Sequence, residues 1–258
     1  VIIAGGAHGM SGAAILAARA AAKCGAGRVF AAFLDEPPAY DAVQPELMCR
    51  HAHDMDFSSG TVVIGPGLGS SHAAHDALAR ALATDRPLVV DADGLNLIAS
   101  RDELRQQLRV RKQPALLTPH PLEAARLLGT SAAQIQADRL AAARKLAATL
   151  NSIIVLKGSG SVIAQPGGEI AINTTGNAAL ATAGTGDVLA GMCGALLAQG
   201  WPQWQSALGA CWLHGLAADT LVAGGTGPIG LTASELIPCA RSLLNHLTGQ
   251  HAQRRTAG

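Results

Sequence analysis

The amino-acid sequence predicts an α/β protein with a central, mostly parallel sheet flanked by helices. Short β-branched runs alternate along the chain with stretches rich in Ala and Leu, an order typical of βαβ units. The 258 residues are 49% hydrophobic, which is enough to bury one large core, and no linker or internal repeat divides them. We therefore expect a single domain over residues 1–258.

The predicted strands are short runs rich in Val, Ile and Leu, as expected for parallel strands buried on both faces. In chain order they are residues 1–4, 29–33, 61–65, 88–92, 115–119, 153–158 and 169–173. The chain begins without Met and inside the first of these runs. We therefore expect it to be truncated at its N-terminus, which leaves room for another domain upstream.

The predicted helices carry apolar residues at helical spacing and are placed to cover the faces of the sheet. They span residues 11–23, 72–84, 121–128, 132–150, 187–199, 203–222 and 232–248. The helix over 132–150 has Ile135, Leu140 and Leu146 on one side, beside Arg139 and basic neighbours. The last three helices are expected to close the domain.

Composition and charge exclude several classes of partner. The net charge is +1 and 14% of residues are charged, so no basic field is available for nucleic acid. The start VIIAGGAHGM has no basic segment before its apolar residues, and the apolar run 188–199 is too short to span a membrane. The five cysteines are scattered and form no C-x-x-C pair. We expect small-molecule partners and a cytoplasmic location.

Glycines, acids and a histidine follow several predicted strands, in VIGPGLG, VVDADGLN, LLTPHPLE and IVLKGSGS. The carboxyl ends of parallel strands form the ligand-binding edge of an open α/β sheet. We therefore expect these loops to meet in one crevice. Asp91 and Asp93 of DADGLN are expected to point to opposite sides, one structural and one facing the crevice, rather than to share a metal.

The segment 173–200, NTTGNAALATAGTGDVLAGMCGALLAQG, contains a single acid, Asp187, at the start of an apolar helix. Gly184 and Gly186 allow the backbone to pass close to a ligand. The unpaired N–H groups of the helix, from Val188 onward, favour an anion. This pattern indicates a phosphate-binding turn; the alternative is that Asp187 only caps the helix.

The other loops are less specific. The glycine-rich turns 4–14 and 65–70 either are tight βα turns or line a nucleotide-sized site, since neither has the G-x-G-x-x-G spacing or a Walker lysine. His120 lies between two prolines with Glu123 three residues on, which favours a ligand-facing role for this histidine. Lys157 either contacts a phosphate or extends away from the sheet.

Taken in this order, GGAHGMSGAA, GPGLG, DADGLN, TPHPLEAARLLG, LKGSGS and TTGNAALATAGTGDVLAG resemble the ADP/ATP-dependent NAD(P)H-hydrate dehydratases. The resemblance covers nearly the whole chain and is most specific in TPHP-x-E and GN-x-A-x-A-x-x-GTGDVL. It implies a ribokinase-like three-layer sandwich. It also implies a nicotinamide-nucleotide repair reaction, the ADP-dependent conversion of NADHX or NADPHX to NADH or NADPH with release of AMP and phosphate.

The resemblance also implies residue roles. Asp187 would be the catalytic base that takes the substrate hydroxyl proton as the oxygen attacks phosphorus. The residues implied for the hydrated dinucleotide are Ala13, Gly67, His120 and Asp187. Those implied for the nucleotide are Lys157, Gly158, Ser159, Gly160, Ser161 and Gly186. Related sugar kinases have Asn-x-x-Glu where this chain has His120 and Glu123, so Glu123 would orient Mg²⁺ through water.

The resemblance further implies a homo-oligomer, such as a tetramer. Bacterial members are often fused behind an NAD(P)H-hydrate epimerase domain, and the missing start of this chain leaves room for such a domain upstream. ADP or ATP would serve as phosphoryl donor. The alternative enzyme is a small-alcohol, vitamin-type kinase of the same fold, since a GTGD turn serves any such hydroxyl. A nucleotide-binding sensor without catalysis is the alternative from another class, and the intact Asp187 beside Gly186 argues against it.

Overall fold

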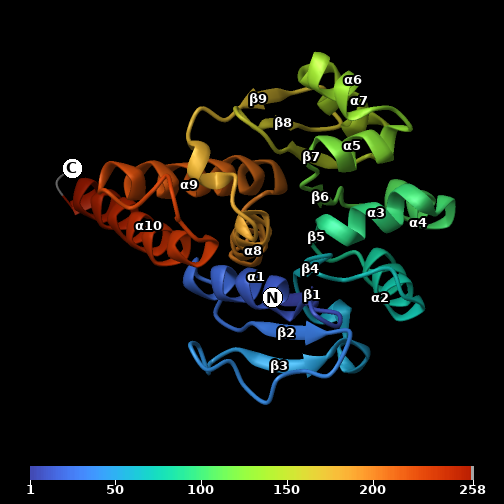
Figure 1. The fold of residues 1–258 in the computed structure, drawn as a ribbon, viewed down its shortest axis with the longest axis horizontal. Helices are drawn as coiled ribbons and strands as arrows, with labels where there is room; N and C mark the ends of the chain where they lie inside the picture. Colours follow the sequence, from blue (N-terminus) through green and yellow to red (C-terminus); the bar gives the residue numbers. More distant parts are fainter. Residues whose placement is uncertain (257–258) are drawn as a thin grey trace.

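A computed structural model describes residues 1–256, with the side chains of residues 1–249. Within these residues the strands form one nine-stranded sheet in the order β3-β2-β1-β4-β5-β6-β7-β8-β9 (Figure 1). The strands are β1 Ile2–Gly5, β2 Phe30–Phe33, β3 Met48–His51, β4 Val62–Ile64, β5 Leu88–Val90, β6 Leu116–Leu117, β7 Ile153–Leu156, β8 Val162–Ala164 and β9 Ile170–Ile172. Neighbours from β3 to β7 pair in parallel, whereas β8 pairs antiparallel with both β7 and β9.

Helices cover both faces of the sheet. They are α1 Ser11–Lys23, α2 His72–Leu82, α3 Ala92–Ser100, α4 Asp102–Arg109, α5 Pro121–Leu128, α6 Ala132–Ala137, α7 Arg139–Leu150, α8 Thr185–Ala198, α9 Gln203–Ala223 and α10 Ala233–Thr256. Short 3-10 turns lie at Ala52–Asp54, Phe57–Ser59 and Ala178–Leu180. Figure 1 shows α1, α8, α9 and α10 grouped together, apart from α2 to α7.

The two helical layers enclose separate apolar cores, which confirms the predicted three-layer α/β architecture. Successive residues of a strand point to opposite faces. Ile3 and Val63 accordingly pack with α1, α8, α9 and α10, whereas Ile2 and Val62 pack with α2 to α7. The sheet is therefore buried on both sides and only its edges and ends reach solvent.

Several elements differ from the sequence-based prediction. The strands β3 and β8 and the helix α3 were not predicted, because β3 has no β-branched residue, β8 is very short and DADGLN has the composition of a turn. No bounds were predicted for α4, although its basic residues Arg105 and Arg109 are typical of a helix end. The single helix expected over 132–150 is broken at Asp138, whose backbone is not helical. The helix expected from Asp187 begins two residues earlier, at Thr185.

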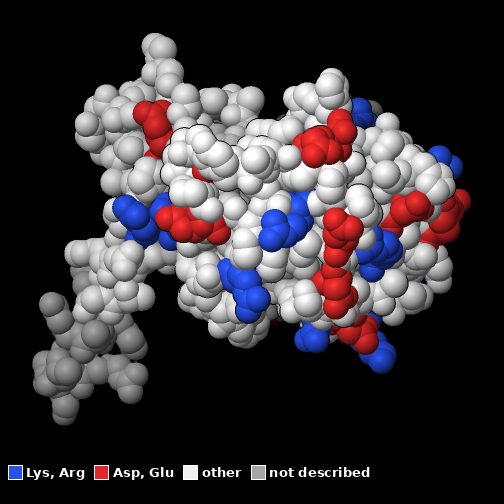
Figure 2. Space-filling model, turned by 90° about the horizontal axis from the view of Figure 1, so that it is seen from below, with Lys and Arg blue, Asp and Glu red and all other residues white. Residues whose placement is uncertain are grey.

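The surface has no extended field of one charge on the face shown in Figure 2, where basic and acidic side chains are interspersed. Among the helices of the described residues, none combines the length and the hydropathy needed to span a membrane.

Candidate active site

The loops after β1 and β4 are joined at the carboxyl edge of the sheet. The Ala7 N–H donates to the Gly67 carbonyl oxygen at 2.7 Å, and the Gly6 N–H donates to the Pro66 oxygen at 3.1 Å. Gly67 has φ +59°, and a Cβ there would lie 2.6 Å from the Met10 carbonyl oxygen and 3.2 Å from the Ala13 Cβ. Only glycine fits this contact, which brings Ala13 and Gly67, both predicted to bind substrate, side by side.

His120 is both the N-cap of α5 and an accessible side chain on the same edge. Its Nδ1 accepts hydrogen bonds from the backbone N–H groups of Leu122 and Glu123, at 3.1 and 3.3 Å. Glu123 completes a capping box, because its Oε2 accepts from the His120 N–H at 2.8 Å. An accepting Nδ1 requires the neutral imidazole, and burial together with Lys157 lowers the pKa of His120.

Asp187 lies in the first turn of α8, after the N-cap Gly184 with φ +88°. Nothing in the described part of the chain donates a hydrogen bond to its carboxylate, and the N-cap makes no side-chain capping bond. Burial and, next, the charge of Asp91 raise the pKa of Asp187 to about 6, while Lys157 opposes this shift. The structure therefore gives no support to a purely capping role.

Lys157 and Asp91 form an ion pair beside Gly186. The Lys157 Nζ donates to Asp91 Oδ1 at 2.7 Å, and the exposed fractions of the two side chains are 21% and 2%. A Cβ on Gly186 would lie 3.3 Å from the Lys157 Nζ. Burial alone would lower the pKa of Lys157, but Asp91 and Glu123 outweigh burial and raise it. Lys157 thus points inward, as a charged group at the α8 N-terminus.

Asp93 and Asp91 have different partners, as predicted. The Asp93 Oδ2 accepts from the Gly69 N–H at 2.9 Å and so holds the glycine loop after β4. The prediction assumed that alternation at a strand end separates the two aspartates, whereas Asp93 lies in the first turn of α3. Asp91 takes the site-facing position, and the residue after it, Ala92, has φ +48°, a strained conformation for an alanine.

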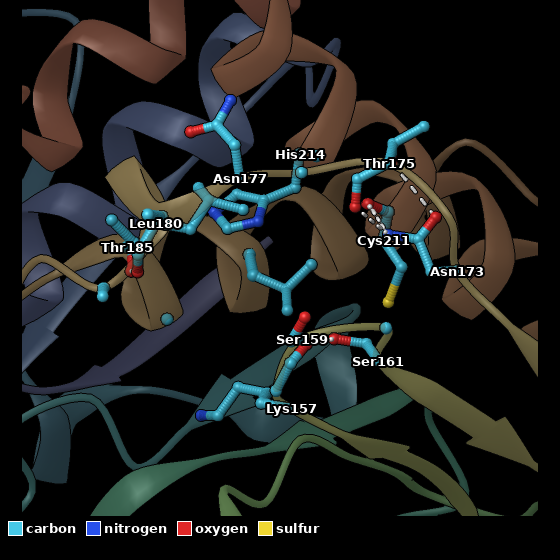
Figure 3. A pocket seen from close by; sticks show the side chains of 18 residues that line it. Lys157, Ser159, Ser161, Asn173, Thr175, Asn177, Leu180, Thr185, Cys211 and His214 are labelled. Carbon is cyan, nitrogen blue, oxygen red and sulfur yellow. Dashed lines mark hydrogen bonds between the residues drawn. The ribbon is translucent and has the colours of Figure 1, made fainter. Parts of the chain in front are cut away.

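A cavity of about 430 Å³ lies beside Lys157 (Figure 3) and is also lined by Gly186. Its volume is within the usual range for small-molecule sites. Every residue predicted to bind the nucleotide lines it: Lys157, Gly158, Ser159, Gly160, Ser161 and Gly186. The opposite wall comes from the segment 173–181, from Thr185 and Leu189 of α8, and from α9.

The residues predicted to bind substrate do not line this cavity. Ala13, Gly67, His120 and Asp187 are all absent from its wall. The candidate residues therefore fall into two groups, and Lys157, Asp91 and Gly186 lie between them. Two groups of residues placed in this way suit two ligands that meet at the N-terminus of α8, where backbone N–H groups favour an anion.

Sequence reasoning missed the far wall of the cavity. Asn173, Thr175 and Asn177 contribute polar groups from the segment after β9, and His214 and Cys211 come from α9. His214 is 8% exposed, and its Nε2 is buried without a hydrogen-bond partner in the described residues. Burial lowers the pKa of His214 to about 4, so the ring is neutral near pH 7. The available signal was a histidine among buried small and apolar residues of α9.

The acidic groups fit Mg²⁺ held mainly by nucleotide phosphates. No group of three or more His, Cys, Asp or Glu side chains within the described ranges is arranged to hold a metal by itself. Burial raises the pKa of Glu123 to about 7, and its two oxygens face the N–H and the Nε2 of His120. Mg²⁺ commonly keeps several waters and takes one or two carboxylates plus phosphates, which this donor set allows.

Comparison with known proteins identifies close relatives. The profile of a family described as NAD(P)H-hydrate dehydratase matches residues 1–238. The chain is 47% identical over 254 residues to the ADP-dependent (S)-NAD(P)H-hydrate dehydratase of Neisseria meningitidis, covering 95% of this chain and 85% of that protein. It is 40% identical over 252 residues to the bifunctional NAD(P)H-hydrate repair enzyme of Coxiella burnetii, covering 95% of this chain and 50% of that enzyme.

Solved structures of a dehydratase and of a ribokinase-like protein have a similar fold. The ADP/ATP-dependent NAD(P)H-hydrate dehydratase of Bacillus subtilis, co-crystallised with ATP and Mg²⁺, has a TM-score of 0.80 at 30% identity, covering 95% of this chain and 88% of that chain. A ribokinase-like superfamily protein of Enterococcus faecalis has a TM-score of 0.81 at 26% identity, covering 95% and 86%. The expected ribokinase-like fold is confirmed.

Proposed function

Because the chain belongs to the NAD(P)H-hydrate dehydratase family, we propose that it catalyses the ADP-dependent dehydration of NADHX and NADPHX. NADH or NADPH, AMP and phosphate are the products. The observation that carries this proposal is the position of Gly186 and Asp187 in the first turn of α8. Gly186 lines the cavity beside Lys157, whereas Asp187 lies outside the cavity wall and near the Lys157–Asp91 pair.

We assign the cavity to the nucleotide and the outer loops to the hydrated dinucleotide. Phosphates suit the cavity because Lys157 and the α8 N-terminus supply positive charge at one end of it. Asp187 then faces the point where the terminal phosphorus meets the substrate hydroxyl. The two groups of residues are the two sides of one reaction centre.

The proposed chemistry is a phosphoryl transfer followed by an elimination. The substrate hydroxyl oxygen attacks the terminal phosphorus of ADP, the bond from that phosphorus to the bridging oxygen breaks, AMP leaves, and Asp187 accepts the hydroxyl proton. The ring nitrogen then donates its electron pair, the carbon–oxygen bond breaks and phosphate departs. Loss of a proton from the neighbouring ring carbon restores the double bond of the dihydronicotinamide.

Asp187 is suited to this role because its pKa, about 6, leaves it ionised yet basic at neutral pH. Lys157 and the N–H groups at the start of α8 stabilise the negative charge on the transferred phosphoryl group. Mg²⁺ bound with the nucleotide would neutralise phosphate charge, and Glu123 is the residue we assign to orient it through water.

Other features of the protein stay predictions. We propose one ribokinase-like domain over residues 1–258, a homo-oligomeric assembly such as a tetramer, and a cytoplasmic location. The chain covers 50% of the bifunctional repair enzyme of Coxiella burnetii and 85% of the dehydratase of Neisseria meningitidis, and an epimerase domain fused upstream stays a prediction. Analytical ultracentrifugation tests the oligomer.

The decisive assay mixes the protein with NADHX, Mg²⁺ and either ADP or ATP. Dehydration predicts recovery of the NADH absorbance with release of one phosphate per NADH. A small-alcohol kinase would instead accumulate a phosphorylated alcohol without free phosphate. Failure to form NADH with either nucleotide would overturn the proposed function.

A further inference from the structure

Arg139, the first residue of α7, contacts the backbone of the loop that follows β7. Its Nη1 donates to the Ser159 carbonyl oxygen at 2.6 Å, and its Nη2 donates to the Leu156 carbonyl oxygen at 3.1 Å. The two terminal nitrogens of the guanidinium thus each donate to one of the two carbonyl groups that flank Lys157 and Gly158. The planar fork fixes the relative positions of these carbonyls in a way that a single ammonium cannot.

The break between α6 and α7 places Arg139 at this position. Asp138 has φ −148° and ψ 86°, and its Oδ1 accepts from the Ala141 N–H at 2.9 Å, which caps a new helix. A continuous helix over 132–150 was the pattern expected from the sequence. Because the chain is interrupted at Asp138, α7 starts next to the loop, and its first side chain lies against the loop backbone.

Gly158 shows how closely Arg139 approaches the loop. Its φ is +155°, and a Cβ built there would lie 2.7 Å from the Arg139 Nη2. A side chain at position 158 would therefore strain the backbone and displace the guanidinium. Gly158, Ser159 and Lys157 all line the cavity, whereas Arg139 does not.

We propose that Arg139 is a positioning residue, which holds the loop 157–161 in the shape that binds the nucleotide without touching the ligand. The assignment of that loop to ADP rests on the proposed function. The positioning role of Arg139 rests only on its contacts with the loop, so this role and the assignment of the loop to ADP can be tested separately.

The first test is hydrogen–deuterium exchange in the ligand-free protein, comparing Arg139→Ala with Arg144→Ala. Arg144 lies exposed on the same helix and serves as the matched control. Exchange in the peptide that covers 157–161 should be about tenfold faster in Arg139→Ala and unchanged in Arg144→Ala. Unchanged exchange in folded Arg139→Ala would overturn the proposal whatever the protein binds.

The second test is calorimetric titration with ADP and Mg²⁺, followed by steady-state kinetics. Arg139→Ala should raise the Kd for ADP about tenfold and leave the KM for NADHX within about twofold. Arg139→Lys, which keeps the charge but not the fork, should show most of the same defect, as should Gly158→Ala. Wild-type affinity for ADP in Arg139→Ala and Arg139→Lys would contradict the positioning role of Arg139. Absence of ADP binding by the wild type would contradict the proposed function.

Discussion

Lys157 and Asp91 directly follow strands β7 and β5, and their side chains meet at 2.7 Å beside Gly186 in the first turn of α8. The pair lies between the nucleotide cavity and the loops assigned to the dinucleotide. It fixes the lysine ammonium next to Gly186 and adds negative charge near Asp187. The same contact therefore positions the positive charge of Lys157 and brings close to Asp187 a carboxylate that raises its pKa.

Asp91→Asn tests this relationship. The change leaves the Lys157 charge largely buried with no ionised partner at hydrogen-bond distance, so we expect a loss of about 3 kcal/mol in the free energy of unfolding at pH 7. Asp93→Asn is the control, since an amide oxygen can still accept from the Gly69 N–H and the loss should be below about 1 kcal/mol. Urea unfolding measures both, and equal losses would show that the pair has no special role.

Gly186→Val tests the anion site at the start of α8. A Cβ there would already lie 3.3 Å from the Lys157 Nζ and 3.7 Å from Asp91 Oδ2, so a branched side chain fills the space assigned to phosphate. ADP binding should be lost in calorimetric titration while the far-ultraviolet circular dichroism is retained. An unchanged ADP affinity would remove Gly186 from the nucleotide site.

His120→Ala and Lys157→Ala test the division into two ligand sites. His120→Ala should weaken NADHX binding about five- to tenfold, the effect of one hydrogen bond, with little change in ADP binding. Loss of the α5 cap should also lower the free energy of unfolding by about 1 kcal/mol.

Lys157→Ala should have the opposite bias and weaken ADP binding more than NADHX binding. Both affinities are measured by titration of each ligand alone. If both variants impaired ADP equally and spared NADHX, the division would be wrong and a kinase would explain the site better.

Much of this arrangement was predictable because local patterns determine it. The limits of α1 and α5 match the predicted 11–23 and 121–128, and α5 is bounded by His120, Pro121 and Gly129. The convergence of loops followed from the parallel strand order, since carboxyl ends of parallel strands share one edge.

The remaining features depend on contacts between distant parts of the chain. The apolar spacing over 132–150 continues across position 138, so this spacing did not reveal the break, where Asp138 caps α7 and Arg139 reaches the loop after β7. His214 joins the cavity through packing of α9 against α8, which no local pattern encodes. The partner of Lys157, Asp91, lies 66 positions earlier in the sequence.

The pH dependence of activity follows from the pKa of Asp187, about 6. A base must be deprotonated, so kcat/KM should rise about tenfold per pH unit below 6 and level off above it. The ionised carboxylate is unfavourable in the folded state, so its effect on stability has the opposite sign. Asp187→Asn should be more stable than wild type at pH 8, and the difference should vanish below pH 4. Thermal unfolding at both pH values measures it.

The most direct test of the account compares kcat of wild type and Asp187→Asn for NADH formation from NADHX with saturating ADP and Mg²⁺. We predict a fall of about 10²–10⁴-fold in the variant, with the ADP Kd within about twofold of wild type, because the amide cannot accept the hydroxyl proton but keeps the shape of the site. A kcat near that of wild type would contradict the assignment of Asp187 as the base.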